Sequence, residues 1–207
     1  MLNLRDSLKL LEKYEIPVVE TYFIDSEDAA VEMAKKIGYP LVMKIISDEI
    51  THKTDIGGVL TGLDTKEKVS EAFWQLSKSK YFKEAALQRS CSGCEIFIGA
   101  KRDPVFGPAI MFGLGGVFVE LLRDVSLRII PAKRDDLHGM MKETKGYKLL
   151  AGYRGRKGVN IDAIIDVLES VSRLMMKEEC VLELDLNPLF ASEEGVVCVD
   201  ARVGVSE

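Results

Sequence analysis

The sequence of 207 residues predicts an α+β protein made of two lobes, residues 1–90 and residues 91–207. Helical and strand patterns alternate through the first ninety residues, whereas strand patterns follow one another closely from residue 95 onward. The composition, with 47% hydrophobic and 29% charged residues, is typical of globular domains that build a core without disulfides. At roughly 150 residues per domain, the length fits one large domain or two small lobes that share a cleft.

Leucines at helical spacing predict a helix over residues 3–15, and Pro17 ends this helix before a β-branched strand. A second helix, capped by Asp25 or Ser26, stops at Gly38. The first lobe is completed by strands 41–46, 57–63 and 84–89 and by a helix that starts near Thr65. These elements make an α/β lobe of about ninety residues.

The second lobe begins with three apolar runs separated by turn residues, which predict an antiparallel sheet. Two helices follow, and two paired strands close the chain. The predicted ranges are strands 95–102, 108–122 and 126–131, helices 134–143 and 160–177, and strands 180–190 and 195–203. Because no low-complexity linker separates the lobes, we expect them to share a face rather than swing on a tether.

The charge balance argues against two classes of partner. The chain carries 28 basic and 33 acidic residues, a net charge of −5, which gives no general attraction to nucleic acid or to an anionic membrane. No apolar run reaches the roughly 18 residues that span a bilayer, and the first residues mix both charges instead of forming a signal peptide. We therefore expect a cytoplasmic protein whose partners include neither nucleic acid nor membrane.

The cysteine pattern does not favour a zinc site. Cys91 and Cys94 form a single CxxC pair, and the two histidines of the chain, His52 and His138, lie far from it in sequence. A structural zinc site needs two further ligands at short spacing. No motif surrounds His138, which we interpret as a structural residue.

Lys44 lies in the middle of the apolar strand 41–46, where a solvated lysine is not expected. One interpretation is an edge strand from which the ammonium reaches water. The other is a phosphate ligand at a cleft, because a buried ammonium needs an anion or must lose its proton. The position in the sequence alone leaves both interpretations open.

A polar loop, residues 47–58, follows this strand and ends in the pair Gly57 and Gly58. Paired glycines allow backbone NH groups to approach an anion, although this loop lacks the P-loop pattern. Within it, His52 is a candidate general base, phosphoryl acceptor or surface residue, and Asp55 lies three positions further on. From these residues alone, the surface interpretation of His52 is favoured.

The closing hairpin carries a row of oxygen ligands. Glu183, Asp185 and Asn187 alternate along one strand and share one face, while Leu182, Leu184 and Leu186 share the other. Asp200 comes 200 − 187 = 13 positions after Asn187, a spacing that suits a hairpin return beside it. Oxygen ligands without histidine or cysteine are typical of magnesium sites. The alternative is the solvated face of an edge hairpin.

Three further features are less specific. The run MFGLGGVFVE fits no dinucleotide or P-loop fingerprint, so its glycines are sufficiently explained by a tight turn. Glu95 and Glu120 flank apolar strands and can face ribose, metal or solvent. The turn GYRGRKG carries Arg154 and Arg156, which can reach a phosphate or a partner, although solvent exposure is the simpler explanation.

Taken in order, a set of motifs resembles one family. These are YEIPV, GYPLVMKI, THKTDIGGV, EIFIGAKRDPVFGPAIMFGLGGVFVELLRDVSLRIIP, LLAGYRG, ELDLNPL and VDARV. The succession is similar to the ATP-grasp (beta) portion of ADP-forming acyl-CoA synthetases of the acetate–CoA ligase type, and it covers nearly the whole chain. Two departures are that Glu15 stands where relatives commonly have glycine, and that Cys94 separates Gly93 from Glu95.

The resemblance implies an ATP-grasp fold in which ATP or ADP, with Mg²⁺, lies between the two lobes. It implies phosphoryl relay by His52, with Asp55 orienting the ring, and Asn187 and Asp200 as magnesium ligands. The implied nucleotide-binding residues are the phosphate-binding Lys44, the loop residues Lys53, Thr54, Gly57 and Gly58, the hinge residues Gln88, Arg89 and Ser90, and Glu95.

The resemblance also implies a partner. In such enzymes, an alpha subunit carries the CoA-binding domains and a histidine that takes the phosphoryl group from an acyl phosphate, so we expect a hetero-oligomer. Two alternatives stay open. One is another ATP-grasp carboxylate–CoA ligase of the succinyl-CoA type, and the other is an ATP-binding regulatory module.

Overall fold

The computed structural model describes residues 1–47, 56–116, 123–155 and 157–206. It divides the chain into a smaller unit, Val19–Ser90, and a larger unit that combines Met1–Val18 with Cys91–Glu207. The units part after Ser90, where the sequence places the boundary between lobes. The first eighteen residues, by contrast, group with the larger unit.

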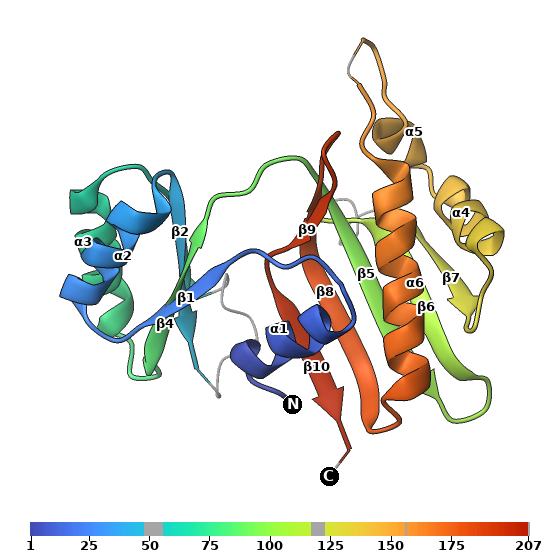
Figure 1. Cartoon of the computed structure of the whole chain (residues 1–207), viewed down its shortest axis with the longest axis horizontal. Helices are drawn as coiled ribbons and strands as arrows, with labels where there is room; N and C mark the ends of the chain where they lie inside the picture. Colours follow the sequence, from blue (N-terminus) through green and yellow to red (C-terminus); the bar gives the residue numbers. More distant parts are fainter. Residues whose placement is uncertain (48–55, 117–122, 156, 207) are drawn as a thin grey trace. The chain divides into compact units, whose positions relative to one another are not determined.

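The smaller unit is an antiparallel sheet with two helices on one face (Figure 1). Its strands follow the order β1-β4-β2-β3. The elements are β1 (Thr21–Ile24), α2 (Glu27–Ile37), β2 (Leu41–Ile46), β3 (Val59–Leu63), α3 (Lys66–Ser77) and β4 (Glu84–Arg89). Each expected helix and strand of this lobe is present, although β1 starts three residues later than the β-branched run.

Side-chain caps set the starts of both helices. The Ser26 hydroxyl accepts a hydrogen bond from the Ala29 amide at 3.4 Å, so Ser26 rather than Asp25 caps α2. The Thr65 hydroxyl caps α3 in the same way, because it accepts a hydrogen bond from the Lys68 amide. Gly38 ends α2 with φ 81°, a conformation that favours glycine. The buried faces of both helices then pack on alternate residues of the strands, including Leu41, Met43, Ile45, Ala85 and Leu87.

The larger unit is a second antiparallel sheet, with the strand order β10-β8-β5-β6-β7 and with β9 paired to β8. Figure 1 shows α6 lying across one face of this sheet. The elements are α1 (Leu4–Lys13), β5 (Cys94–Asp103), β6 (Gly107–Leu114), β7 (Val125–Ile129), α4 (Arg134–Glu143), α5 (Tyr147–Leu150), α6 (Ile161–Lys177), β8 (Val181–Ala191), β9 (Val196–Cys198) and β10 (Ala201–Val205). The short helix α5 was not expected from the sequence, and the single strand expected over 195–203 is divided into β9 and β10, which both pair with β8.

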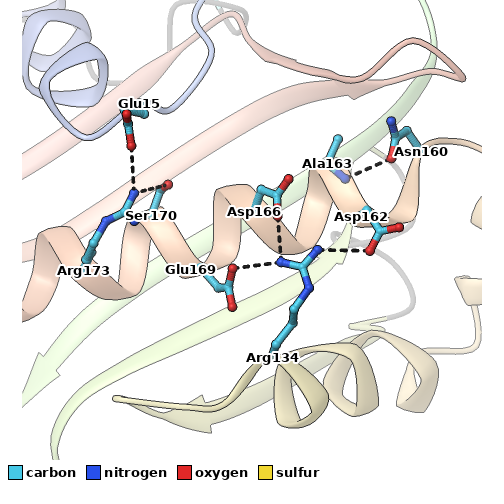
Figure 2. A network of polar contacts seen from close by, with 9 residues as sticks. All are labelled: Glu15, Arg134, Asn160, Asp162, Ala163, Asp166, Glu169, Ser170 and Arg173. Carbon is cyan, nitrogen blue, oxygen red and sulfur yellow. Dashed lines mark hydrogen bonds and ion pairs between the residues drawn. The ribbon is translucent and has the colours of Figure 1, made fainter.

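Two arginines fix α6 in this unit. Arg102 of β5 donates to the backbone carbonyls of Met175 at 2.5 Å and Glu178 at 3.4 Å at the end of α6, and to that of Val181 at the start of β8 at 3.3 Å. The carbonyls at the end of α6 carry the negative end of the helix dipole, so a cation is favourable there. Arg134 of α4 binds three carboxylates on successive turns of α6, Asp162, Asp166 and Glu169, at 3.0, 2.7 and 2.8 Å (Figure 2).

The N-terminal segment is tied to the larger sheet by backbone hydrogen bonds. The Leu2 amide donates to the Val203 carbonyl, and the Cys198 amide donates to the Pro17 carbonyl, both at 2.8 Å. Helix α1 ends at Lys13 with Tyr14 as its C-cap, and the next residue, Glu15, has a left-handed φ of 59° and a carboxylate 3.3 Å from Arg173. The chain therefore uses glutamate in a conformation that favours glycine.

Among the helices in the described residues, none is long and apolar enough to cross a membrane.

We expect Glu15→Gly to stabilise the protein by about 1 kcal/mol, because glycine adopts the left-handed conformation without the Cβ clash. The lost ion pair with Arg173 is exposed and contributes little. Thermal unfolding should show a midpoint about 2–4 °C higher. The matched control is Glu12→Gly inside α1, which should lower the midpoint. A lower midpoint for Glu15→Gly would contradict the strain argument.

A second prediction concerns pH. Hydrogen bonds from Arg128 and Ser126 lower the pKa of Glu143 from its ordinary value of 4.5 to about 2. Because the folded pKa is depressed, this carboxylate stabilises the protein above pH 4.5, and the contribution is lost as the pH falls through about 2. Glu143→Gln should lower the unfolding midpoint at pH 7, and the difference from the wild type should shrink between pH 4.5 and 2. A difference independent of pH would contradict this assignment.

Candidate functional site

Lys44 is buried, with 6% of its surface exposed. Its strand β2 lies between β4 and β3, and Lys44 pairs with Ala86 on one side and Val59 on the other. The edge-strand interpretation is therefore wrong. Since Met43 and Ile45 point into the core beneath the helices, Lys44 points to the opposite, helix-free face of the sheet. A charged group there is compatible with an anionic ligand.

Gln88 lies on the same helix-free face, two residue pairs further along the strands. It is opposite Val42 in β2 and Thr21 in β1, and only 1% of its surface is exposed. The side-chain amide of Gln88 donates a hydrogen bond to the Thr21 hydroxyl at 2.9 Å, and that hydroxyl donates one to the Val19 carbonyl. The side chain of Gln88 therefore holds the ends of β1 and β4 together.

The next two residues lead out of the smaller unit. Arg89 pairs with Leu41, and its exposed guanidinium lies 3.5 Å from the Ile37 carbonyl. The Ser90 amide donates to the Pro40 carbonyl at 2.9 Å. The backbone is therefore held to β2 up to Ser90, the residue before the boundary between the units. Binding of nucleotide by Gln88, Arg89 and Ser90 stays a prediction.

The glycine pair at the end of the polar loop is positioned by β2. Gly57 has φ 67°, which disfavours any other residue, and the Gly58 carbonyl accepts a hydrogen bond from the Ile45 amide at 2.8 Å. The predicted site residues His52, Lys53, Thr54 and Asp55 lie outside the described residues. Their roles stay predictions from the sequence.

Asn187 and Asp200 lie side by side in the larger unit, as the spacing predicts. The Asn187 amide donates to the Asp200 carbonyl at 3.3 Å, and the next residue pair is Leu186 with Ala201. Asn187 is exposed and Asp200 half-buried, and one Asp200 carboxylate oxygen accepts from the Ala201 amide at 3.0 Å. Two oxygen-bearing side chains thus start from adjacent backbone positions.

The acidic row continues along β8 on the face opposite the buried Leu184 and Leu186. Asp185 pairs with Gly99 and Arg202, and Glu183 pairs with Gly204, where an added Cβ would lie 2.6 Å from the Glu183 Cγ. Gly204 therefore leaves room for the Glu183 side chain. This was not expected from the sequence, although a glycine inside a strand pattern signals close approach.

The prediction that Leu182 shares the buried face with Leu184 and Leu186 is wrong. The Leu182 side chain is 43% exposed. The cause is a register shift in the β8–β10 pairing between Gly204 and Val205, which interrupts the strict alternation at this end of the strand.

The donors at Asn187 and Asp200 fit magnesium. Among the described residues, no group of three or more histidine, cysteine, aspartate or glutamate side chains is placed to hold a metal. Magnesium does not require such a cage, because it is commonly held by one or two protein oxygens together with substrate phosphates and water. The pair supplies one amide and one carboxylate oxygen, which is a hard, oxygen-only donor set.

Glu95 lies against the glycine-rich turn that follows β6. Its carbonyl accepts from the Gly115 amide at 2.8 Å, and a Cβ on Gly116, which has φ 60°, would lie 2.9 Å from the Glu95 carboxylate. These glycines are therefore explained by close approach to Glu95 as well as by the turn. The Glu95 side chain is exposed, and its nucleotide role stays a prediction.

Comparison with protein-family models identifies the fold family. Residues 1–205 match the ATP-grasp domain. This chain belongs to the ATP-grasp family. The predicted ATP-grasp fold of helices and antiparallel sheets is thereby confirmed.

Known members resemble the chain over almost its full length. It is 42% identical over 206 residues to the beta subunit of acetate–CoA ligase (ADP-forming) I of Pyrococcus furiosus, covering 96% of this chain and 89% of that subunit. It is also 42% identical to acetate–CoA ligase (ADP-forming) II of Archaeoglobus fulgidus, where 98% of this chain matches only 30% of the longer protein. The chain thus spans under a third of that relative.

A solved structure gives the same result. Acetyl-coenzyme A synthetase 1 of Ca. Korarchaeum cryptofilum, in complex with coenzyme A and Ca-AMPCP, superposes with a TM-score of 0.93 at 40% identity, covering 99% of this chain and 93% of that chain. A second structure of that protein holds Mg-AMPPCP, with a phosphohistidine segment pointing towards the nucleotide-binding site. The predicted resemblance to ADP-forming synthetases is confirmed.

We expect Lys44→Met to weaken ATP binding at least tenfold, which corresponds to about 1.4 kcal/mol. The substitution keeps the length of the side chain but removes the ammonium that would neutralise phosphate oxygens. Calorimetric titration of ATP in excess magnesium measures the effect. The control is Lys35→Met on the exposed surface of α2, which should bind like the wild type. Equal affinity for Lys44→Met would remove the lysine from the site.

Proposed function

We propose that this chain is the nucleotide-binding, phosphoryl-transferring part of an ADP-forming acyl-CoA synthetase. The single observation that carries the proposal is the position of a buried cation: Lys44 lies in a central strand, on the face of the sheet opposite helices α2 and α3. A second support comes from the larger unit, where the oxygen donors Asn187 and Asp200 lie next to each other. Relatives with ADP-forming acetate–CoA ligase activity that match nearly the whole chain support the reaction class.

In this proposal, the nucleotide phosphates meet Lys44 and the magnesium ligands. Phosphoryl transfer depends on in-line positioning and charge neutralisation more than on covalent chemistry by the protein. Bound Mg²⁺ would neutralise phosphate charge and fix phosphate geometry. Asn187 and Asp200 would hold that ion, Lys44 would neutralise charge on the phosphate oxygens, and the backbone from Gln88 to Ser90 with Glu95 would position the nucleoside.

His52 completes the proposed relay. A phosphohistidine on the partner gives its phosphoryl group to the imidazole of His52, and a P–N bond forms as the partner's P–N bond breaks. The phosphoryl group then passes from His52 to a β-phosphate oxygen of ADP, which yields ATP and a free imidazole. Asp55 orients the ring, and Lys53, Thr54, Gly57 and Gly58 contact the phosphates.

The partner supplies the other half of the reaction. It binds the acyl-CoA and inorganic phosphate, releases CoA as an acyl phosphate forms, and frees the acid as its own histidine takes the phosphoryl group. The acyl group is then chosen by the partner, so acetate or another carboxylic acid is compatible with this chain. A hetero-oligomer follows from this division of labour. The cytoplasmic location expected from the sequence stays a prediction.

Reconstitution tests this function. The purified chain with its CoA-binding partner, acetyl-CoA, ADP, phosphate and magnesium should form ATP, and His52→Ala should reduce the rate at least a thousandfold, because the relay nucleophile is lost. His138→Ala is the matched control. This second histidine of the chain lies on α4 with its Nε2 3.4 Å from the Tyr147 hydroxyl, so its loss should leave the rate nearly unchanged.

Labelling separates the proposal from the regulatory alternative. Incubation with ATP labelled at the γ-phosphate should give a protein label that is acid-labile, base-stable and absent from His52→Ala. A chain that binds ATP with magnesium but never acquires this label would be a nucleotide-binding regulatory module instead. If succinyl-CoA replaced acetyl-CoA with equal efficiency, the succinyl-CoA type of ligase would be favoured.

A further inference from the structure

A cavity in the larger unit is lined by side chains of α4, α5 and α6. Helices α4 and α6 pack against each other, and α5 follows α4 in the chain (Figure 1). The volume of the cavity is about 370 Å³, which lies within the range of small-molecule sites. None of the residues that line it is a predicted nucleotide or magnesium ligand. The cavity therefore has no role in the proposed reaction.

One part of the lining is apolar and aromatic. Ile161 and Ile165 lie one turn apart on α6, the first half-buried and the second 3% exposed. The rings of His138 and Tyr147 also line the cavity, with their centroids 6.4 Å apart and their planes tilted by 59°. Two branched side chains and two rings favour a flat organic ring over a bare metal ion or an inorganic ion.

The charged part of the lining is acidic. Among the described residues that line the cavity, Arg134 is the one with a permanent positive charge. Its guanidinium is already bound by three carboxylates of α6, those of Asp162, Asp166 and Glu169 (Figure 2). Asp135 adds an exposed carboxylate, which forms no ion pair within the part of the chain that the structure describes. This charge distribution favours a positively charged ligand.

We propose that this cavity is a binding site for a small organic cation that carries one aromatic ring. The ring packs on Ile161 and Ile165, and the cationic group pairs with Asp135. Attraction between the cation and the Tyr147 ring adds to the affinity. A free phosphate or carboxylate is disfavoured, because it would meet the Asp135 carboxylate. The inference does not depend on the proposed function, since the proposed reaction uses none of these residues.

Nuclear magnetic resonance of the histidine rings tests the site, because the chain has two histidines, His52 and His138. The full chain is prepared with isotope-labelled histidine, and the spectrum of His52→Ala assigns the signals of His138. The three probes share one ring and differ in charge: benzylamine is a cation, benzyl alcohol is neutral and benzoate is an anion. The shifts of the His138 signals during titration give the dissociation constant of each probe.

We expect benzylamine to shift the His138 signals in a saturable way, with a dissociation constant of about 1 mM, within the affinity range that so few atoms allow. Benzoate should bind about tenfold more weakly, because its charge is repelled where that of benzylamine is attracted. Benzyl alcohol should lie between the two. The His52 signals should not move.

Matched substitutions test the two parts of the lining. Asp135→Asn removes the carboxylate without touching the Arg134 contacts to α6, and it should weaken benzylamine binding about fivefold. The control is Asp28→Asn, since Asp28 is likewise an exposed acid in the first turn of a helix, α2. Tyr147→Phe keeps the ring and should bind like the wild type, whereas Tyr147→Leu should bind about fivefold more weakly. Thermal unfolding shows which variants are folded, and Asp135→Asn decides if Tyr147→Leu is not.

The cation site would be overturned by any one of three results. These are unchanged His138 signals with benzylamine, equal affinity for benzylamine and benzoate, and equal affinity of Asp135→Asn and Asp28→Asn for benzylamine. Shifts confined to His52 would place the probe at the polar loop and would overturn it as well. Because the titration contains neither nucleotide nor partner, such a failure would leave the proposed function standing.

Discussion

The cost of burying one ammonium group is the physical constraint on which this account depends. Lys44 is 6% exposed in a strand that is paired on both sides. Removing a charge from water costs several kcal/mol unless an opposite charge or hydrogen bonds compensate. In the proposed function, the nucleotide phosphates add to the interactions that Lys44 makes within the chain, and together they compensate the buried charge.

Each of the two sheets has one apolar face that is covered by helices and one face that carries polar side chains. Helices α2 and α3 cover the apolar face of one sheet, and α6 covers that of the other, so strand alternation leaves a second face for polar groups. On β2 that face carries Lys44, and on β8 it carries Glu183 and Asp185 in line with Asn187. In the larger sheet Gly204 leaves room for Glu183, and in the smaller sheet the buried side-chain amide of Gln88 adds a polar group without charge.

Local patterns could be read from the sequence, whereas sheet order could not. The strands over 41–46 and 84–89 and the Asn187–Asp200 adjacency follow from side-chain period and loop length, which act over a few residues. The central position of β2 depends on its pairing with β4, which lies some forty residues later in the chain. The sequence therefore did not decide whether Lys44 is buried. The grouping of Met1–Val18 with the larger unit likewise rests on hydrogen bonds to residues near 200, which no local pattern reveals.

A crystal structure with bound Mg-ADP would test the central claim most directly. The account predicts the Lys44 ammonium about 3 Å from a phosphate oxygen. It also predicts oxygens of Asn187 and Asp200 about 2.1 Å from the magnesium ion, the distance normal for magnesium ligands. A nucleotide bound to another surface, or phosphates out of reach of Lys44, would contradict it.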